Sequence, residues 1–178
     1  MVAAFYGKAG CVRILTEKEA GMKDGDNMTA LMFAAYNGHA DCVEMLVERE
    51  AGIEEECDMT ALMYAAEKGY TQCVRFLLDK EARMRDKDGW TALMSAASYG
   101  HLECVKMLAP LERGLRNNEG RTALYFTHYA PSNKECAYFL YQFPEERKTR
   151  GLREVKKKYS FSKVKPAQSV CCAAVYAD

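Results

Sequence analysis

We predict an all-α solenoid of stacked antiparallel helix pairs with short loop fingers, and the main reason is an internal repeat. The tetrapeptide Thr-Ala-Leu-Met begins at residues 29, 60 and 91, and Thr-Ala-Leu-Tyr begins at residue 122, a constant step of 31 residues. An Ala pair, a glycine and a Cys-Val pair recur with the same step, beginning at Ala34, Gly38 and Cys42. Four copies in one register indicate that each copy is one structural unit.

Each copy carries the signals of two short helices. Thr29 can accept hydrogen bonds from the free N–H groups of a helix start, and Gly38 can end that helix in a left-handed conformation. We therefore expect a first helix over residues 29–37. From residue 40 to residue 47 apolar side chains recur at helical spacing, which predicts a second helix packed antiparallel to the first. A polar loop follows, with Ile53 as its one regular apolar residue.

The two ends of the chain depart from this pattern. Met1 corresponds to Met32, so the chain begins inside a repeat, and we expect either a fragment or an internal Met taken as the start. In the last copy Thr127 and His128 replace the Ala pair, and Pro131 interrupts the glycine turn. Atypical terminal repeats of this kind usually cap a solenoid.

The predicted unit boundaries follow the threonines. Beyond residue 143 the pattern is lost, but Leu152, Val155 and Tyr159 at helical spacing predict a further capping helix. The units are a truncated first repeat (1–28), three full repeats (29–59, 60–90 and 91–121), a degenerate C-terminal capping repeat (122–143) and a basic tail (144–178). We expect the tail to be partly helical or disordered.

The repeat resembles that of the ankyrin repeat family, whose pattern runs T-P-L-H-x-A-A-x-x-G-H and continues into a second helix with a Leu-rich end. Residues 29–39, T-A-L-M-F-A-A-Y-N-G-H, match it position by position, and Asp88-Gly89-Trp90-Thr91 matches the turn of the family. The likeness covers residues 1 to about 143. It implies an ankyrin-repeat solenoid with a concave binding groove.

Departures from the family pattern lead to further expectations. Met32 stands where the family has a histidine that links neighbouring loops, so less of the order between repeats should be polar. The repeat is two residues shorter than the family's 33, so the loop fingers should be short. A left-handed residue other than glycine costs on the order of 1 kcal/mol. The glutamates that replace the helix-ending glycine bear this cost if they keep its left-handed geometry: Glu19, Glu50, Glu81 and Glu112.

Composition indicates a soluble protein of a reducing compartment, which we expect to be the cytoplasm. No stretch approaches the roughly 18 apolar residues of a membrane span. The sequence has eight cysteines but shows no secretory signal peptide, which disfavours a disulfide framework. There are 16 basic and 21 acidic residues up to Phe143, and 9 and 4 after it. An acidic body disfavours nucleic acid as the partner of the repeats.

Residue types that carry catalysis or bind metals form no recognisable site in the sequence. His39 and His101 fall on the Gly-His turn, and no nucleophile and carboxylate accompany them. The carboxylates at 54–56 lack the alternating spacing of a calcium loop. One cysteine per copy takes the place of a buried valine of the family, so we expect it in the core: Cys11, Cys42, Cys73, Cys104 and Cys136. We predict no catalytic residue, no metal and no cofactor, and hence no enzyme.

The resemblance implies a non-catalytic interaction module, a monomeric scaffold or adaptor that binds another protein with its groove and loop tips. The expected binding residues vary between repeats and lie after each Ala pair, before each threonine and at the loop tips. They are Tyr36, Asn37, Glu67, Lys68, Ser98, Tyr99, Met28, Met59, Trp90, Arg121, Arg85 and Lys87. Trp90, Tyr36 and Tyr99 are the expected anchors, because Trp, Tyr and Arg dominate measured interface energies.

Two alternative functions stay open at this point. The chain can be a piece of a larger regulatory enzyme such as a protein kinase, since ankyrin repeats are often attached to catalytic domains. The tail can instead associate with anionic lipid or nucleic acid, because it combines the cysteines at 171 and 172 with basic residues. These basic residues are Lys156, Lys157, Lys158, Lys163 and Lys165.

Overall fold

The computed structural model describes residues 1–129 and 133–161, and every regular element within these ranges is helical. The predictions that concern Pro131, Lys163, Lys165 and the cysteines at 171 and 172 fall outside the described residues. In chain order the elements are α1 (Val2–Phe5), α2 (Ala9–Glu19), α3 (Ala30–Tyr36), α4 (Ala40–Glu50), α5 (Ala61–Lys68), α6 (Thr71–Glu81), α7 (Ala92–Tyr99), α8 (Leu102–Glu112), α9 (Ala123–Phe126), α10 (Lys134–Tyr141), the 3-10 helix η2 (Glu146–Lys148) and α11 (Leu152–Lys158).

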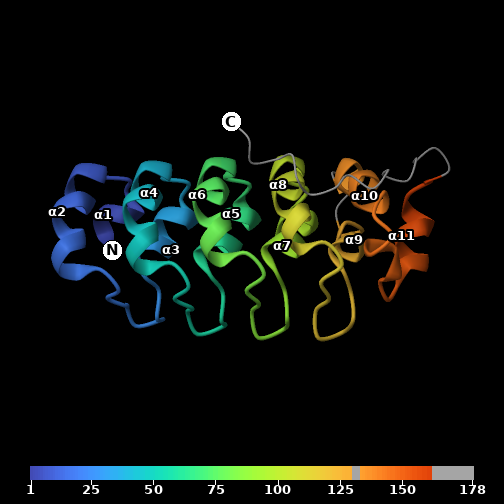
Figure 1. Ribbon diagram of the computed structural model, residues 1–178, viewed down its shortest axis with the longest axis horizontal. Helices are drawn as coiled ribbons and strands as arrows, with labels where there is room; N and C mark the ends of the chain where they lie inside the picture. The colour runs from blue at the N-terminus through green and yellow to red at the C-terminus, as the bar shows by residue number, and fades with distance from the viewer. Residues whose placement is uncertain (130–132, 162–178) are drawn as a thin grey trace.

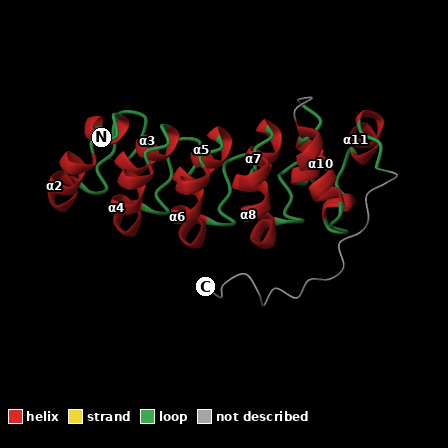
Figure 2. Ribbon diagram, turned by 90° about the horizontal axis from the view of Figure 1, so that it is seen from above, coloured by secondary structure: helices red, strands yellow, loops and turns green. Residues whose placement is uncertain are grey.

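The helices stack side by side in two rows (Figures 1 and 2). In the first row α1, α3, α5, α7 and α9 each contact the next, and in the second row α2, α4, α6, α8 and α10 do the same. Loops between consecutive repeats project from one side of the stack (Figure 1). The predicted solenoid of helix pairs is confirmed.

The first helix of each of the three full repeats, α3, α5 and α7, begins and ends where the sequence predicts. Thr29 has extended backbone angles, and its hydroxyl accepts a hydrogen bond from the N–H of Met32 at 3.3 Å. Thr60 caps α5 in the same way, whereas the side chains of Thr91 and Thr122 form no such cap. The helix ends because the glycine after it, at 38, 69 and 100, adopts a positive φ that other residues disfavour.

The second helices extend three residues beyond the predicted 40–47, and α4 ends at Glu50. Val43 and Leu46 are buried on the face that packs against the rest of the stack. The expected core position of the cysteines holds for Cys42, Cys73, Cys104 and Cys136. It is wrong for Cys11, which is exposed because no earlier helix of the second row covers α2.

A buried glutamate carboxylate connects each pair of adjacent repeats. The side chain of Glu81 is almost fully buried at the end of α6. One of its oxygens accepts the N–H of Gly52, in the turn of the preceding repeat, at 3.0 Å. The other accepts the N–H of Leu62, at the start of its own repeat, at 2.7 Å. Glu50, Glu112 and Glu146 accept an equivalent pair of bonds, one from the preceding turn and one from the start of the first-row helix.

The positions of these carboxylates differ from two predictions made from the sequence, one on the glutamate backbone and one on the polarity of the contacts between repeats. The glutamates do not adopt the left-handed conformation, because the positive φ falls two residues later, at Gly21, Gly52, Arg83 and Gly114. The order between repeats is also strongly polar, although Met replaces the linking histidine. Burial raises the pKa of Glu81, Glu112 and Glu146, and the two N–H donors to each carboxylate oppose that shift.

The C-terminal end of the stack continues past residue 143. Glu146 supplies the last buried carboxylate from η2, although it lies out of the 31-residue register. The helix predicted from Leu152 is confirmed as α11, with Val155 fully buried. Tyr159 follows it and donates its phenol proton to the backbone oxygen of Thr127 at 2.8 Å. Residues 144–161 therefore cover the last repeat.

We expect Glu81→Gln to lower the free energy of unfolding by about 1–3 kcal/mol, because the new amide N–H₂ faces a backbone N–H that loses its acceptor. Urea unfolding followed by circular dichroism measures this loss. Glu48→Gln is the matched control, since Glu48 is 71% exposed in its ion pair with Lys80. The control should change stability by less than about 0.5 kcal/mol. Equal losses in the two variants would contradict the proposed role of the carboxylate.

We expect alkylation of the native protein at pH 8 to separate the cysteines by burial. Burial raises the pKa of Cys73, Cys104 and Cys136 to about 11, so only on the order of one thiol in a thousand is ionised at that pH. Cys11 and Cys57 are exposed and should react first. Peptide mass spectrometry after a short iodoacetamide pulse tests this, with urea-unfolded protein as the control. Equal labelling of Cys73 and Cys57 in the native protein would contradict the packing described.

Candidate functional site

The projecting loops, which we call fingers, are tight turns with one shared geometry. In finger 3, residues 86–90, the N–H of Asp86 donates to the backbone oxygen of Trp90 at 3.1 Å. The N–H of Trp90 donates back to the Asp86 carboxylate at 2.7 Å. Fingers 1, 2 and 4 (24–28, 55–59 and 117–121) close in the same way. The side chain at the first position of each finger therefore fixes the loop, a role that was not predicted from the sequence.

Long basic side chains connect neighbouring fingers. The guanidinium of Arg85 donates to the backbone oxygen of Arg116 at 2.8 Å, and the ammonium of Lys87 donates to the backbone oxygen of Glu56. Arg85 and Lys87 are exposed at the tips, as predicted, but their cationic ends are already hydrogen-bonded within the protein. They position the fingers as a row whether or not they also contact a partner.

The residues that precede each threonine are half-buried. Met28 and Met59 pack against the core at the base of their fingers, as does Trp90. Trp90 lies on Phe126 of the C-terminal capping repeat, with ring centroids 4.1 Å apart. Arg121 forms an ion pair with Glu119 and lies over the ring of Tyr125, 4.3 Å from its centroid. Only part of the side chain of each of these four predicted residues is therefore accessible to solvent.

An aromatic and charged cluster joins the second and third repeats. Tyr36 is 40% exposed and packs edge-to-face on Tyr64, with ring centroids 5.8 Å apart. The ammonium of Lys68 lies 4.5 Å from the centre of the Tyr36 ring and 3.0 Å from the Glu67 carboxylate. Burial, together with the nearby carboxylate of Glu55, raises the pKa of Tyr64 to about 12. The structure therefore brings three predicted residues, Tyr36, Glu67 and Lys68, into one contact group.

The remaining predicted residues lie at the ends of the first-row helices. The Asn37 side chain donates to the backbone oxygen of Phe33 at 2.8 Å, which closes its own helix. Ser98 is half-buried, and its backbone oxygen accepts from the Asn133 side chain at 2.6 Å. Tyr99 is 56% exposed. We call the surface formed by fingers 1–4 and by the C-terminal ends of the first-row helices the finger face.

The last repeat contributes residues to the finger face that were not predicted from the sequence. Tyr129 is 55% exposed and stands in register with Tyr36, Glu67 and Ser98. Phe126 is in register with Tyr64. The 31-residue step is enough to place both residues in the set of equivalent positions. They were not predicted because the loss of the Ala pair indicated that this repeat is a cap.

His39 and His101 each connect two repeats. The ring Nε2 of His39 lies 2.9 Å from the backbone oxygen of Phe5, and that of His101 lies 2.8 Å from the backbone oxygen of Glu67. Each therefore bonds the preceding repeat. Within residues 1–129 and 133–161, no group of three or more His, Cys, Asp or Glu residues is arranged to hold a metal ion.

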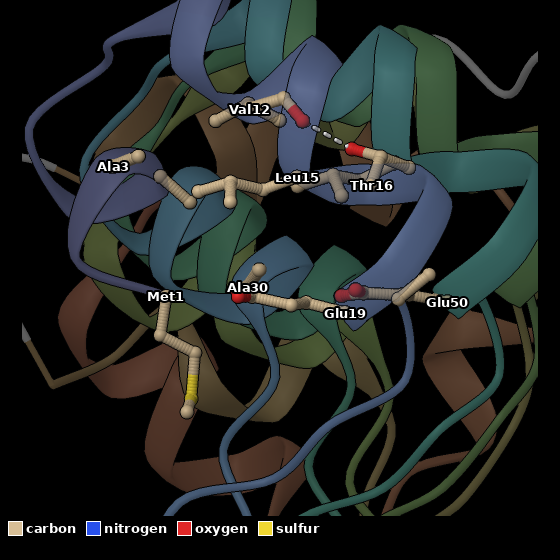
Figure 3. A pocket seen from close by; sticks show the side chains of 11 residues that line it. Met1, Ala3, Val12, Leu15, Thr16, Glu19, Ala30 and Glu50 are labelled. Carbon is tan, nitrogen blue, oxygen red and sulfur yellow. Dashed lines mark hydrogen bonds between the residues drawn. The ribbon is translucent and has the colours of Figure 1, made fainter.

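Two hollows lie at the N-terminal end of the stack. One, shown in Figure 3, is lined by α1, α2 and Glu50 and has a volume of about 20 Å³, too small for an organic ligand. The second, of about 410 Å³, is an apolar surface depression lined by Met1, Val2, Phe5, Tyr6 and Phe33 together with Asp24. Neither hollow contains residues from the predicted set.

Comparison with known families identifies the scaffold. The profile described as "Ankyrin repeats (3 copies)" matches residues 1–88 and 80–149. The chain belongs to the ankyrin repeat family. A comparison with curated proteins gives no match. No helix in the described part of this ankyrin chain has the length and apolar character needed to cross a membrane.

Membership gives the general role of the repeats. Ankyrin repeats are generally protein–protein interaction modules, and the family is typically non-catalytic. Extended stacks of this kind bind with surfaces that run across several repeats. On this ankyrin chain the finger face runs across the three full repeats, and its side chains differ between them, as Tyr36, Glu67 and Ser98 do.

Proposed function

We propose that this ankyrin chain is a non-catalytic scaffold that binds a partner protein with its finger face. One observation carries the proposal: at equivalent positions of successive repeats, the side chains that reach solvent differ in chemistry while the backbone beneath them repeats. Tyr36 is followed one repeat later by Glu67 and then by Ser98, and Asn37 by Lys68 and then Tyr99. A repeated backbone with varied exposed side chains is suited to partner-specific recognition.

The rigidity of the stack supports this proposal. The buried carboxylates and the bridges between fingers fix the relative positions of the repeats before a partner arrives. A preorganised surface loses less conformational entropy on binding than a mobile one does. The finger face therefore needs few strong contacts to bind a partner.

The exposed aromatic residues are the proposed anchors. Tyr36 and Tyr99 are accessible and have only two side-chain torsions to immobilise, so their burial by a partner costs little entropy. Trp90 contributes the exposed part of a ring that is already fixed on Phe126. Arg85, Lys87 and Arg121 are secondary in this proposal, because a partner has to compete with their internal hydrogen bonds.

We also propose that the protein is a monomer in a reducing compartment such as the cytoplasm. The four core cysteines are free thiols packed among apolar side chains. Oxidation to a charged acid at any of these positions would place an unpaired charge in the core. The packing is therefore compatible with conditions that keep thiols reduced.

The proposal predicts that Tyr36→Ala with Tyr99→Ala reduces capture of the cellular partner at least tenfold, equivalent to about 1.4 kcal/mol of binding free energy. Adding Trp90→Ala should reduce capture further. The full chain serves as bait, the partner is identified by mass spectrometry, and its affinity is then measured with purified proteins. Thermal melting of each variant separates loss of binding from loss of folding.

The matched control changes three exposed residues of the second-row helices, Glu48→Ala, Arg75→Ala and Glu103→Ala. This control should leave affinity unchanged within about twofold, since these side chains lie away from the finger face. Full affinity in the Tyr36 and Tyr99 double variant, with loss of affinity in the control, would overturn the proposal. A partner retained by residues 144–178 alone would favour the tail instead.

A further inference from the structure

A pocket of about 210 Å³ opens between finger 3 and finger 4 on the finger face. Three aromatic rings line it: Trp90 from finger 3, Phe126 from α9 and Tyr129 from the residues after α9. Its polar lining includes Asp88, Asn118 and Glu119. A volume of this size matches one large side chain rather than a cofactor.

The aromatic lining is fixed before anything binds. Phe126 is almost fully buried, and Trp90 and Tyr129 each pack on it. The Trp90 and Phe126 rings are inclined by 40°, and the Phe126 and Tyr129 rings are stacked with centroids 6.0 Å apart. The pocket therefore offers the accessible parts of the Trp90 and Tyr129 rings, supported from beneath by Phe126, and the faces of such rings carry partial negative charge that attracts a cation.

The polar lining is rich in acceptors. The Asn118 amide nitrogen donates to the backbone oxygen of Lys87 at 2.8 Å, which leaves its amide oxygen directed towards Gly89. Arg121 is the one cation in the lining, and it is ion-paired with Glu119. Among the described residues no lysine or arginine forms an ion pair with Asp88. The pocket thus combines aromatic rings with the Asp88 carboxylate and the Asn118 amide in its lining.

We propose that this pocket receives an arginine side chain from a peptide segment of the partner, with its guanidinium on the aromatic rings and facing Asp88. A guanidinium is flat and weakly hydrated, and it carries five N–H donors, so it can stack and donate to several acceptors together. A lysine ammonium is compact and more strongly hydrated, and it stacks less well. An acidic side chain would be repelled by Asp88. The inference rests on the proposed protein-binding role and specifies the chemistry of that partner.

Trp90 makes a direct test possible because it is the single tryptophan of the chain. We expect its emission to change saturably when the full-length protein is titrated with the peptide acetyl-Gly-Arg-Gly-amide, with a dissociation constant on the order of 1 mM. The same peptide with citrulline in place of arginine keeps the shape without the charge and should bind at least tenfold more weakly. The lysine peptide should bind about threefold more weakly than the arginine peptide.

Variants then locate the site. Asp88→Asn and Tyr129→Ala should each weaken binding of the arginine peptide at least fivefold. Glu103→Ala should leave it unchanged, because Glu103 is exposed on α8 and does not line the pocket. The indole N–H resonance of Trp90 in a two-dimensional NMR spectrum reports binding independently of emission, and circular dichroism verifies that each variant is folded.

Equal affinity for the arginine and citrulline peptides would overturn the inference, and so would the absence of any Trp90 response up to about 50 mM peptide. Unchanged binding in folded Asp88→Asn and Tyr129→Ala would overturn it as well. The titration uses no cellular partner, so its failure leaves the proposed binding by the finger face standing. Conversely, if the Tyr36 and Tyr99 variants keep the cellular partner, the pocket result still decides this inference.

Discussion

The buried carboxylates of the second helices fix how each repeat sits on the one before it. Each accepts one N–H from its own repeat and one from the preceding turn, as Glu81 does with Leu62 and Gly52. A charged group excluded from water is stable only when its acceptor sites are satisfied, so small displacements between repeats are costly. Burial of apolar side chains drives the stacking of the repeats. Apolar helix faces alone would allow many relative positions of two adjacent repeats, and the carboxylate selects one of them.

This constraint explains why the finger face can work as a binding surface. The fingers begin within a few residues of the turns that donate to the carboxylates, and Arg85 and Lys87 connect the region of finger 3 to those of fingers 4 and 2. Residues from different repeats, such as Trp90 and Tyr129, are thereby held around one pocket. The scaffold supplies the geometry, and the side chains that vary between repeats supply the chemistry.

The sequence predicted the fold well because the 31-residue step, the threonine starts and the glycine ends each act locally. It failed where the outcome depends on tertiary contacts. The glutamates were read as strained helix ends, because a sequence does not reveal that their carboxylates meet N–H groups of two repeats. Cys11 was placed in the core by register, although burial needs a covering neighbour. Tyr129 was missed because the altered Ala pair obscured a register that still holds.

The account's central claim is that the partner lies across the finger face of a preformed stack. Hydrogen–deuterium exchange of the full chain, with and without its purified partner, tests this most directly. The account predicts slower exchange on binding in the fingers and at the C-terminal ends of α3, α5 and α7, with α4, α6 and α8 unchanged. Slowing confined to the second-row helices or to residues 144–161 would contradict it.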